Sequence, residues 1–207
     1  MTLILASQSP RRRDLLGRLN IPFEVVASDL DERSPLVGED PVQYSVLLAR
    51  HKAQQVAQQR PEALVIGADT VVAVDVTILG KPATDDDAVR MLGLLRGRAH
   101  LVVTGMALQR GTQVISSNVA SPVRMRTYSD EEMRRYVATG EPFDKAGSYA
   151  VQGLGGRLVE RVEGCYLAVV GLPLCRLVEM LVRMGQPTTQ HIWCSFCSQR
   201  FPRHDAV

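Results

Sequence analysis

The chain begins with a strand that leads through a turn directly into a helix, and this order constrains the fold more than any other feature. The apolar run Leu3–Ala6 ends at the hydroxyl of Ser7, and Asp14-Leu15-Leu16 starts a helical pattern. Ser9 suits the N-cap and Pro10 the first helical position. A helix start of this kind offers unpaired backbone N–H groups and a partial positive charge, so it favours an anion.

Three consecutive arginines add side-chain charge to the same turn, namely Arg11, Arg12 and Arg13. Guanidinium groups and helix N-termini are both common phosphate ligands, so the turn predicts a phosphate site. A solvated basic helix start would show the same residues, and the turn alone does not separate the two interpretations.

The pattern along the chain predicts a mixed α/β sheet rather than a purely parallel one, because strands and helices alternate at first and a strand pair follows. The expected strands span residues 3–7, 23–27, 64–68, 71–74, 100–109, 113–126 and 166–170. The expected helices span residues 10–20, 41–59, 85–95, about 130–139 and 173–183. Arg110-Gly111 suits a hairpin turn, and Ser129 with Glu132 forms a capping-box pattern.

Size and charge limit the classes of protein. The 207 residues, 45% of them hydrophobic, suffice for one large domain or two small lobes. A net charge of +2 and 5% aromatic residues disfavour a nucleic-acid-binding or membrane-surface module. The sequence shows neither a secretory pattern nor a run long enough to span a bilayer, so we expect a cytoplasmic protein.

Four residues have side chains suited to phosphate chemistry. Asp69 follows the most apolar strand, where an open sheet places its ligands, although an aspartate there also caps turns. Lys81 lies in a Gly-Lys-Pro turn, and Lys52 lies on the apolar face of its helix. Exposure of Lys81 and snorkelling of Lys52 are the alternatives. Gln152, between two glycine segments, offers an amide that can recognise a base edge, and an empty loop is its alternative.

Seven motifs occur together in the order typical of one family. They are Leu5-Ala6-Ser7-x-Ser9-Pro10-Arg11-Arg12, Gly67-Ala68-Asp69-Thr70-Val71-Val72, Gly80-Lys81-Pro82, Thr104-Gly105, Gly140-Glu141-Pro142-x-Asp144-Lys145-Ala146-Gly147, Gln152-Gly153 and Val170-Gly171-Leu172-Pro173-Leu174. Over residues 1 to about 185 the chain therefore resembles the Maf-like proteins.

The resemblance implies a fold and an activity. The fold would be an elongated mixed β-sheet with flanking helices, its two lobes around a cleft, similar to inosine triphosphatases. The activity would be hydrolysis of a nucleoside triphosphate to the monophosphate and pyrophosphate, with Mg²⁺ or Mn²⁺, in nucleotide-pool housecleaning. The Asp144-Lys145-Ala146-Gly147 motif with Gln152 resembles the dTTP/UTP branch. Ala150-Val151 departs from the usual Gly-Ile of that branch. Many members look dimeric, so a homodimer is expected.

The resemblance also assigns roles to residues. Asp69 matches the general base, and Glu32 with Asp69 would hold the metal. The phosphate-facing positions are matched by Ser7, Arg11, Arg12, Lys52 and Lys81. Substrate choice would depend on Arg11, Thr70 and Gln152.

Two other functions compete with this one. One is a regulator of septum formation and cell division that binds nucleotide without turnover, and the other is a pyrophosphatase acting on 7-methyl-GTP. The presence of Asp69 together with the basic residues favours turnover, because a pure binder needs no base.

Residues 186–207 lie outside the resemblance and form a predicted C-terminal tail after the domain of residues 1–185. Cys194-x2-Cys197 suits a zinc site that His191 and His204 would complete, although the spacing fits no standard finger. The short segment has no core of its own, which favours a loose tail over a zinc site. Cys165 and Cys175 are expected as small buried hydrophobic residues.

Overall fold

The computed structural model describes residues 2–28, 35–190, 192 and 194–200. Its centre is a seven-stranded mixed sheet in the order β2 (Glu24–Val25), β1 (Leu3–Ala6), β3 (Leu64–Val74), β5 (Ala99–Arg110), β6 (Gln113–Met125) and β7 (Val159–Val162), with β4 (Thr77–Leu79) also paired to β3. β1 runs parallel to β2 and β3, and the other pairs are antiparallel. The predicted mixed α/β fold is confirmed.

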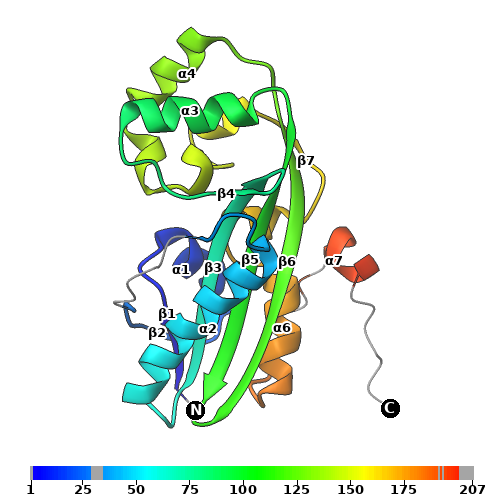
Figure 1. Cartoon of the computed structure of the whole chain (residues 1–207). Helices are drawn as coiled ribbons and strands as arrows, with labels where there is room; N and C mark the ends of the chain where they lie inside the picture. Colours follow the sequence, from blue (N-terminus) through cyan, green and yellow to red (C-terminus); the bar gives the residue numbers. More distant parts are fainter. Residues whose placement is uncertain (1, 29–34, 191, 193, 201–207) are drawn as a thin grey trace.

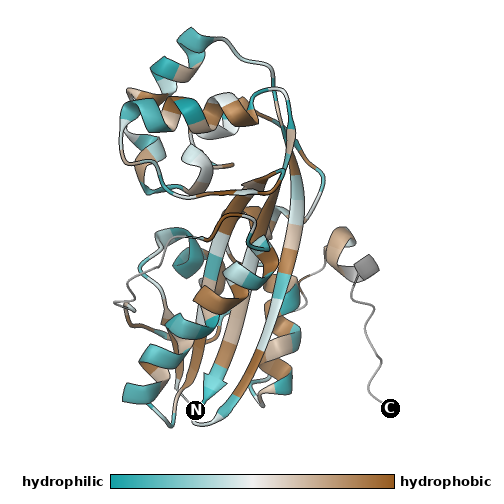
Figure 2. Ribbon diagram, viewed as in Figure 1, coloured by the Kyte–Doolittle hydropathy of each residue, from teal (hydrophilic) through white to brown (hydrophobic). Residues whose placement is uncertain are grey.

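Two lobes share the long strands β3, β5 and β6 (Figure 1). One lobe carries α1 (Pro10–Gly17), α2 (Pro41–Gln59) and α6 (Leu174–Arg183), and the other carries α3 (Asp85–Leu95) and α4 (Asp130–Val137). The chain also forms short 3-10 turns at Glu141–Asp144, Ala146–Ser148 and Gly155–Leu158. Figure 2 shows the sheet largely apolar along its length. The elongated two-lobed shape agrees with the prediction.

Each lobe has its own apolar core. In the first lobe α1 and α6 pack on one face of the sheet through Leu16 and Leu177, which contact Leu5 and Ile66 in one cluster. In the second lobe a separate cluster joins Val72 of β3 to α3 and α4. A cavity lies between the two cores. The strand β3 runs through both of them, while α1 and α6 cover it in the first lobe and α3 and α4 in the second.

Glycines bring α2 unusually close to the sheet. A Cβ atom on Gly67 of β3 would lie 2.1 Å from the carbonyl oxygen of Ala49, and one on Gly105 of β5 would lie 2.4 Å from the backbone of Ser45. Any side chain at these positions would push the helix away. The close approach places Lys52, one turn beyond Ala49, directly over the middle of β3.

Several predicted elements are confirmed at the residue level. The helices α2 and α3 have the expected bounds, and Arg110 ends β5 before the hairpin turn. The Ser129 side chain accepts a hydrogen bond from the backbone of Glu132, whose carboxylate accepts one from the Ser129 backbone. Among the described residues, no helix has both the length and the apolar character needed to cross a membrane.

The predicted strand at residues 166–170 is wrong, because Tyr166–Val170 forms the short helix α5. A short apolar run does not distinguish a buried strand from a buried helix. Here Gly171, with φ of 124°, ends the helix, and β7, which the sequence analysis missed, pairs with β6 instead. The tail also forms a helix, α7 (Ser195–Arg200), that was not predicted.

Candidate active site

A gap along one edge of β3 opens a cavity in the middle of the sheet. β1 pairs with β3 only as far as Gly67, and β4 pairs with it only from Val72 onward. Asp69 lies in this interval. The prediction that its strand ends at Asp69 is therefore wrong, since β3 runs on to Val74. The carboxylate still reaches the opening, because the neighbouring strand stops before it.

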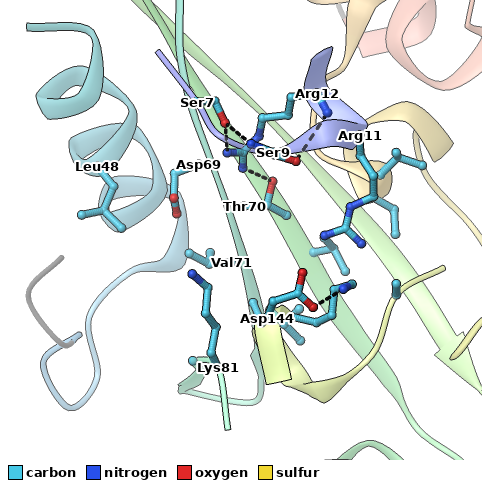
Figure 3. Close-up of a pocket in the computed structure, with 18 of the residues that line it drawn as sticks. Ser7, Ser9, Arg11, Arg12, Leu48, Asp69, Thr70, Val71, Lys81 and Asp144 are labelled. Carbon is cyan, nitrogen blue, oxygen red and sulfur yellow. Dashed lines mark hydrogen bonds and ion pairs between the residues drawn. The ribbon is translucent and has the colours of Figure 1, made fainter. Parts of the chain in front are cut away.

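The cavity has a volume of about 810 Å³ and both lobes contribute to its walls. Six segments line it: the turn after β1, one face of α2, the exposed edge of β3, the turn after β4, residues 144–152 and the end of α5. Eight of the predicted site residues line it: Ser7, Arg11, Arg12, Lys52, Asp69, Thr70, Lys81 and Gln152. Figure 3 shows several of these side chains directed toward one space.

A buried ion pair forms one wall of the cavity. Lys52 Nζ donates a hydrogen bond of 2.6 Å to Asp69 Oδ1, and both residues are less than 10% exposed. A buried charge is costly unless it has a partner, which explains why a lysine is tolerated on the apolar face of α2. The contact fixes the orientation of the carboxylate toward the cavity.

Arg12 joins three segments that are distant in the sequence. Its guanidinium donates to the Gly171 carbonyl oxygen at 3.0 Å, to Ser7 Oγ at 3.3 Å and to Thr70 Oγ1 at 3.2 Å. Thr70 Oγ1 lies 2.8 Å from Thr104 Oγ1. Arg12 therefore holds the turn after β1 against β3 and the end of α5, a positioning role beyond the phosphate contact predicted for it.

The turn after β1 forms as predicted. Ser9 caps α1 by accepting a hydrogen bond from the backbone of Arg12, and Ser7 Oγ accepts one from the backbone of Ser9 at 3.2 Å. The three arginines then diverge. Arg11 and Arg12 line the cavity, whereas Arg13 is exposed beside Asp14.

Two cations extend into the cavity from opposite lobes. Arg11 belongs to the first lobe, and the exposed Lys81 follows β4 in the second (Figure 3). Asp144 accepts a hydrogen bond from Lys145. Partial burial opposes ionisation of Asp144, yet Lys145 and the charge of Arg11 hold the pKa of this carboxyl below its usual value. The positive charge of Arg11 thus acts across the cavity.

The glycine segments around Gln152 have a structural reason. Glu141 accepts hydrogen bonds from the backbone of Leu154 at 3.0 Å and of Gly155 at 2.9 Å. A Cβ atom on Gly153 would lie 2.8 Å from the Glu141 carboxylate. The loop wraps around this carboxylate, and its glycines permit that contact. Gln152 stays exposed on the cavity rim.

A buried histidine supports the cavity floor. A hydrogen bond of 2.6 Å joins His100 Nε2 on β5 to Tyr149 Oη, and Tyr149 lines the cavity. Burial lowers the pKa of His100 to about 4, so its ring is neutral near neutral pH. Among the described residues, His100 Nδ1 has no hydrogen-bond partner.

Three predicted residues lie outside the described part of the chain: Glu32 of the metal pair, and His191 and His204 of the tail set. Conversely, the sequence analysis did not single out Thr104, Lys145 or Tyr149 as site residues. The family motifs contained Thr104 and Lys145. Lys145 and Tyr149 line the cavity, whereas Thr104 is fully buried and contacts the cavity-lining Thr70.

The expectation that Cys165 and Cys175 are small buried residues is confirmed. Both lie next to Cys194 and Cys197 in a single cluster, because α7 folds back against the start of α5 and α6. The choice between a loose tail and a metal-binding tail over residues 186–207 stays a prediction.

The composition of the cavity wall suits a polyanion. Arginine and lysine side chains from both lobes surround the cavity, and its buried acid lies at one wall beside Lys52. An arrangement of this kind can bind several phosphate groups while a carboxylate acts on a water molecule next to them.

Comparison with known proteins agrees with this geometry. A family model described as Maf-like protein matches residues 2–184. A protein of Dictyoglomus turgidum named dTTP/UTP pyrophosphatase is 49% identical over 88% of this chain and 96% of its own length. A protein of Geotalea uraniireducens with the same name is 50% identical over 88% of this chain and 95% of its own.

Among solved structures, the Staphylococcus aureus Ham1 protein aligns with 96% of this chain and 90% of its own. The sequence identity is 11% and the TM-score is 0.46.

Proposed function

The chain belongs to the Maf-like protein family, and on that basis we propose that it hydrolyses dTTP and UTP to the monophosphate and pyrophosphate. The names of its relatives, at nearly 50% identity over most of both chains, support this activity. The observation that carries the proposal is the buried Lys52–Asp69 pair at the wall of a basic cavity. Pyrophosphate release places the cleavage between the α- and β-phosphates.

The cationic side chains bind the triphosphate from both lobes. Lys52, Lys81 and Arg11 neutralise its negative charge, and Arg12 contributes while holding the turn after β1 in place. These contacts fix the phosphates relative to Asp69, which lowers the entropic cost of the reaction.

Asp69 acts as the general base in the proposed mechanism. It accepts a proton from a water molecule whose oxygen attacks the α-phosphorus. The bond from that phosphorus to the bridging oxygen breaks, and pyrophosphate leaves with the bonding electrons. Lys52 holds the carboxylate in place through its hydrogen bond to Oδ1.

A divalent cation fits the donors in this cavity. Asp69 provides a carboxylate, and Mg²⁺ usually binds through one or two carboxylates together with substrate phosphates and water. Glu32, the second proposed ligand, lies outside the described residues. When bound, Mg²⁺ or Mn²⁺ supplies charge neutralisation at the phosphate oxygens.

Gln152, Arg11 and Thr70 are proposed to select the nucleotide. Gln152 has the amide donor and acceptor needed to pair with a pyrimidine edge, and it lies on the rim where a base would project. Thr70 contributes through its hydrogen bonds to Arg12 and Thr104, which shape the wall behind the phosphates. The homodimer and the cytoplasmic location stay predictions.

The test is a panel of nucleoside triphosphates assayed for pyrophosphate release, with dTTP, UTP and 7-methyl-GTP included. We expect dTTP and UTP to give the highest kcat/KM, and Asp69→Asn to lower kcat on dTTP by roughly 10²–10⁴-fold. The matched control is Asp75→Asn, since Asp75 is exposed in the turn after β3 and pairs with Arg98.

Each result of the panel has one meaning. Near-full turnover by Asp69→Asn would remove Asp69 from the role of base. Tight binding of dTTP without release of pyrophosphate would favour the regulator of cell division, and a preference for 7-methyl-GTP would favour the sister activity.

A further inference from the structure

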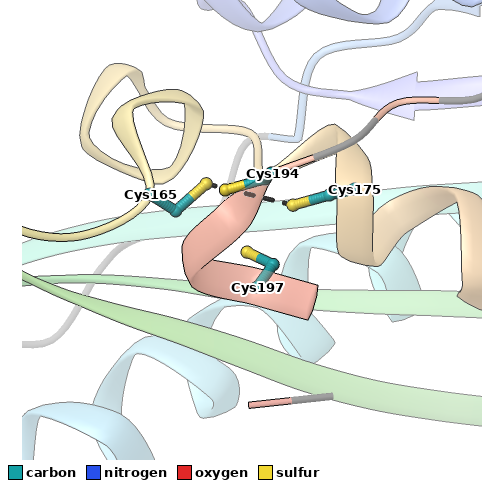
Figure 4. Close-up of side chains that lie close together, drawn as sticks. All are labelled: Cys165, Cys175, Cys194 and Cys197. Atoms are coloured by element: carbon teal, nitrogen blue, oxygen red, sulfur yellow. Dashed lines mark hydrogen bonds between the residues drawn. The ribbon is translucent and has the colours of Figure 1, made fainter. Parts of the chain in front are cut away.

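Four cysteine sulfurs converge at a second site, at the N-terminal end of α5, whereas the cavity is lined by Val169 and Val170 near the C-terminal end of this helix. Cys165 caps the N-terminus of α5, Cys175 lies in the first turn of α6, and Cys194 and Cys197 belong to the tail. Figure 4 shows the four side chains turned toward one another. All four Sγ atoms lie within 4.8 Å of one another.

The separations match those in a metal–thiolate site. With Zn–S bonds of about 2.3 Å, a regular tetrahedron places its sulfurs about 3.8 Å apart. Cys165 Sγ and Cys175 Sγ are 3.9 Å apart, and the largest separation in the cluster stays below 4.8 Å. A small contraction of the cluster would therefore bring every sulfur to bonding distance from a central ion.

The surroundings of the cluster are those of a closed site. Cys165, Cys175 and Cys197 are all less than 10% exposed, and Cys194 is half-buried. The neighbouring side chains are apolar, among them Val119, Ala168, Leu167, Ile192 and Phe196. Four soft thiolates, three of them on buried residues, are typical of structural zinc rather than of a catalytic metal.

We propose that Cys165, Cys175, Cys194 and Cys197 bind one Zn²⁺ ion that fastens the C-terminal segment to the catalytic domain. Each thiol releases its proton to solvent as its Zn–S bond forms, so no oxidant is required. The metal replaces the apolar core that the tail lacks, since a segment this short buries little surface of its own.

The site also supports the wall of the nucleotide cavity. The Cys165 backbone is fixed to β6, because its N–H donates to Ser121 Oγ at 3.0 Å. Five residues further on, Val170 lines the cavity, and the Gly171 carbonyl oxygen accepts the hydrogen bond from Arg12. Zinc at the start of α5 therefore restrains the helix whose end positions Arg12.

The decisive experiment measures metal content by elemental analysis of the full-length chain purified without added metal or affinity tag. We expect about one zinc per chain in the unaltered protein and a loss of nearly all of it in Cys194→Ser and in Cys165→Ser. Cys194 lies beyond residues 2–184, which match the family model, so its variant leaves the catalytic domain intact.

His191→Ala and His204→Ala are the matched controls, since the tail sequence alone pairs these histidines with Cys194 and Cys197. Both variants should keep their zinc. Loss of zinc from the histidine variants with retention in Cys165→Ser would overturn the proposal. So would iron in place of zinc, zinc well below one per chain, or disulfide bonds found by intact mass under non-reducing conditions.

A second measurement tests the fastening itself. Limited proteolysis should leave the zinc-loaded protein whole and should cleave Cys194→Ser within residues 186–193 at least 10-fold faster. Pyrophosphate release by the same variant should fall no more than several-fold, because α5 stays packed against β5 and β6. Equal cleavage rates in the two proteins would contradict the fastening role.

Discussion

The cavity and the cysteine cluster adjoin opposite ends of α5, and the two sites differ in exposure and in donor chemistry. The cavity is open, lined by cations from both lobes, and its buried acid pairs with a lysine. The cluster is closed, apolar in its surroundings, and made of four sulfurs. The difference in donors suggests different ligands: charged oxygen and nitrogen groups suit a phosphate-bearing substrate, whereas four thiols suit a soft metal ion such as Zn²⁺.

The two sites also differ in how their parts are connected. Arg12 and Thr70, which line the cavity, are hydrogen-bonded to each other and to α5. Arg12 donates to the Gly171 carbonyl oxygen, and Thr70 contacts Thr104, which donates to the Ala168 carbonyl oxygen. The cluster reaches the same short helix from its other end, through Cys165. Changes in one site should therefore leave the other nearly intact, with α5 as the element through which any remaining effect passes.

Apart from Asp69→Asn, the largest effect expected from a single change on the cavity side comes from Lys52→Met. Methionine fills a similar volume but removes the charge and the hydrogen bond to Asp69, so kcat on dTTP should fall about 10³-fold. The unfolding free energy in urea should fall by about 3 kcal/mol, since a buried charge loses its lysine partner. Zinc content should be unchanged, and a loss of zinc would show that the two sites are not independent.

Acid should weaken the cavity floor through His100. The pKa of this residue is about 4 in the folded protein and close to 6.5 when unfolded, so the unfolded state binds more protons between these values. Stability is then full above about pH 6.5 and is lost as the pH falls toward 4, by about 3 kcal/mol at most.

His100→Gln keeps a hydrogen-bonding group near Tyr149 but does not titrate, so its unfolding free energy should vary less over this range. Acid also removes zinc from thiolates, so the same measurement on Cys194→Ser separates the two contributions. Equal pH dependence in the unaltered protein and in His100→Gln would show that His100 is not the cause.

Arg12→Lys tests whether Arg12 positions the cavity wall through its hydrogen bonds or contributes charge alone. The lysine keeps the charge but cannot contact Gly171, Ser7 and Thr70 together, so kcat/KM should fall by about 10–30-fold. The expected loss of unfolding free energy is about 1–2 kcal/mol. If Arg12 contributed charge alone, the lysine variant would keep its full activity.

The smallest effect is expected at the rim of the cavity. Gln152→Ala should reduce the preference for dTTP over a purine triphosphate by about 3–10-fold, since one exposed hydrogen-bonding group is lost. The ratio of kcat/KM values measures it directly. An unchanged ratio would move the choice of base to another part of the cavity.

Local signals in the sequence predicted much of the fold. The cap at Ser9, the capping box at Ser129 and the apolar spacing of α2 depend on neighbours within one or two turns, and each formed as expected. For residues 166–170 the apolar run predicted a strand, but Tyr166–Val170 forms the helix α5. A run this short is compatible with either element. The division at residue 185 stays a prediction.

The sequence by itself determined the strand, the capped helix start and the family of the chain, because caps depend on near neighbours and the seven motifs occur in a family-specific order. Only the tertiary structure decided that Asp69 meets Lys52, which depends on two glycines that let α2 approach the sheet. It also decided that Cys165 and Cys175 join the tail cysteines, because these two cysteine pairs become neighbours only after the core has formed.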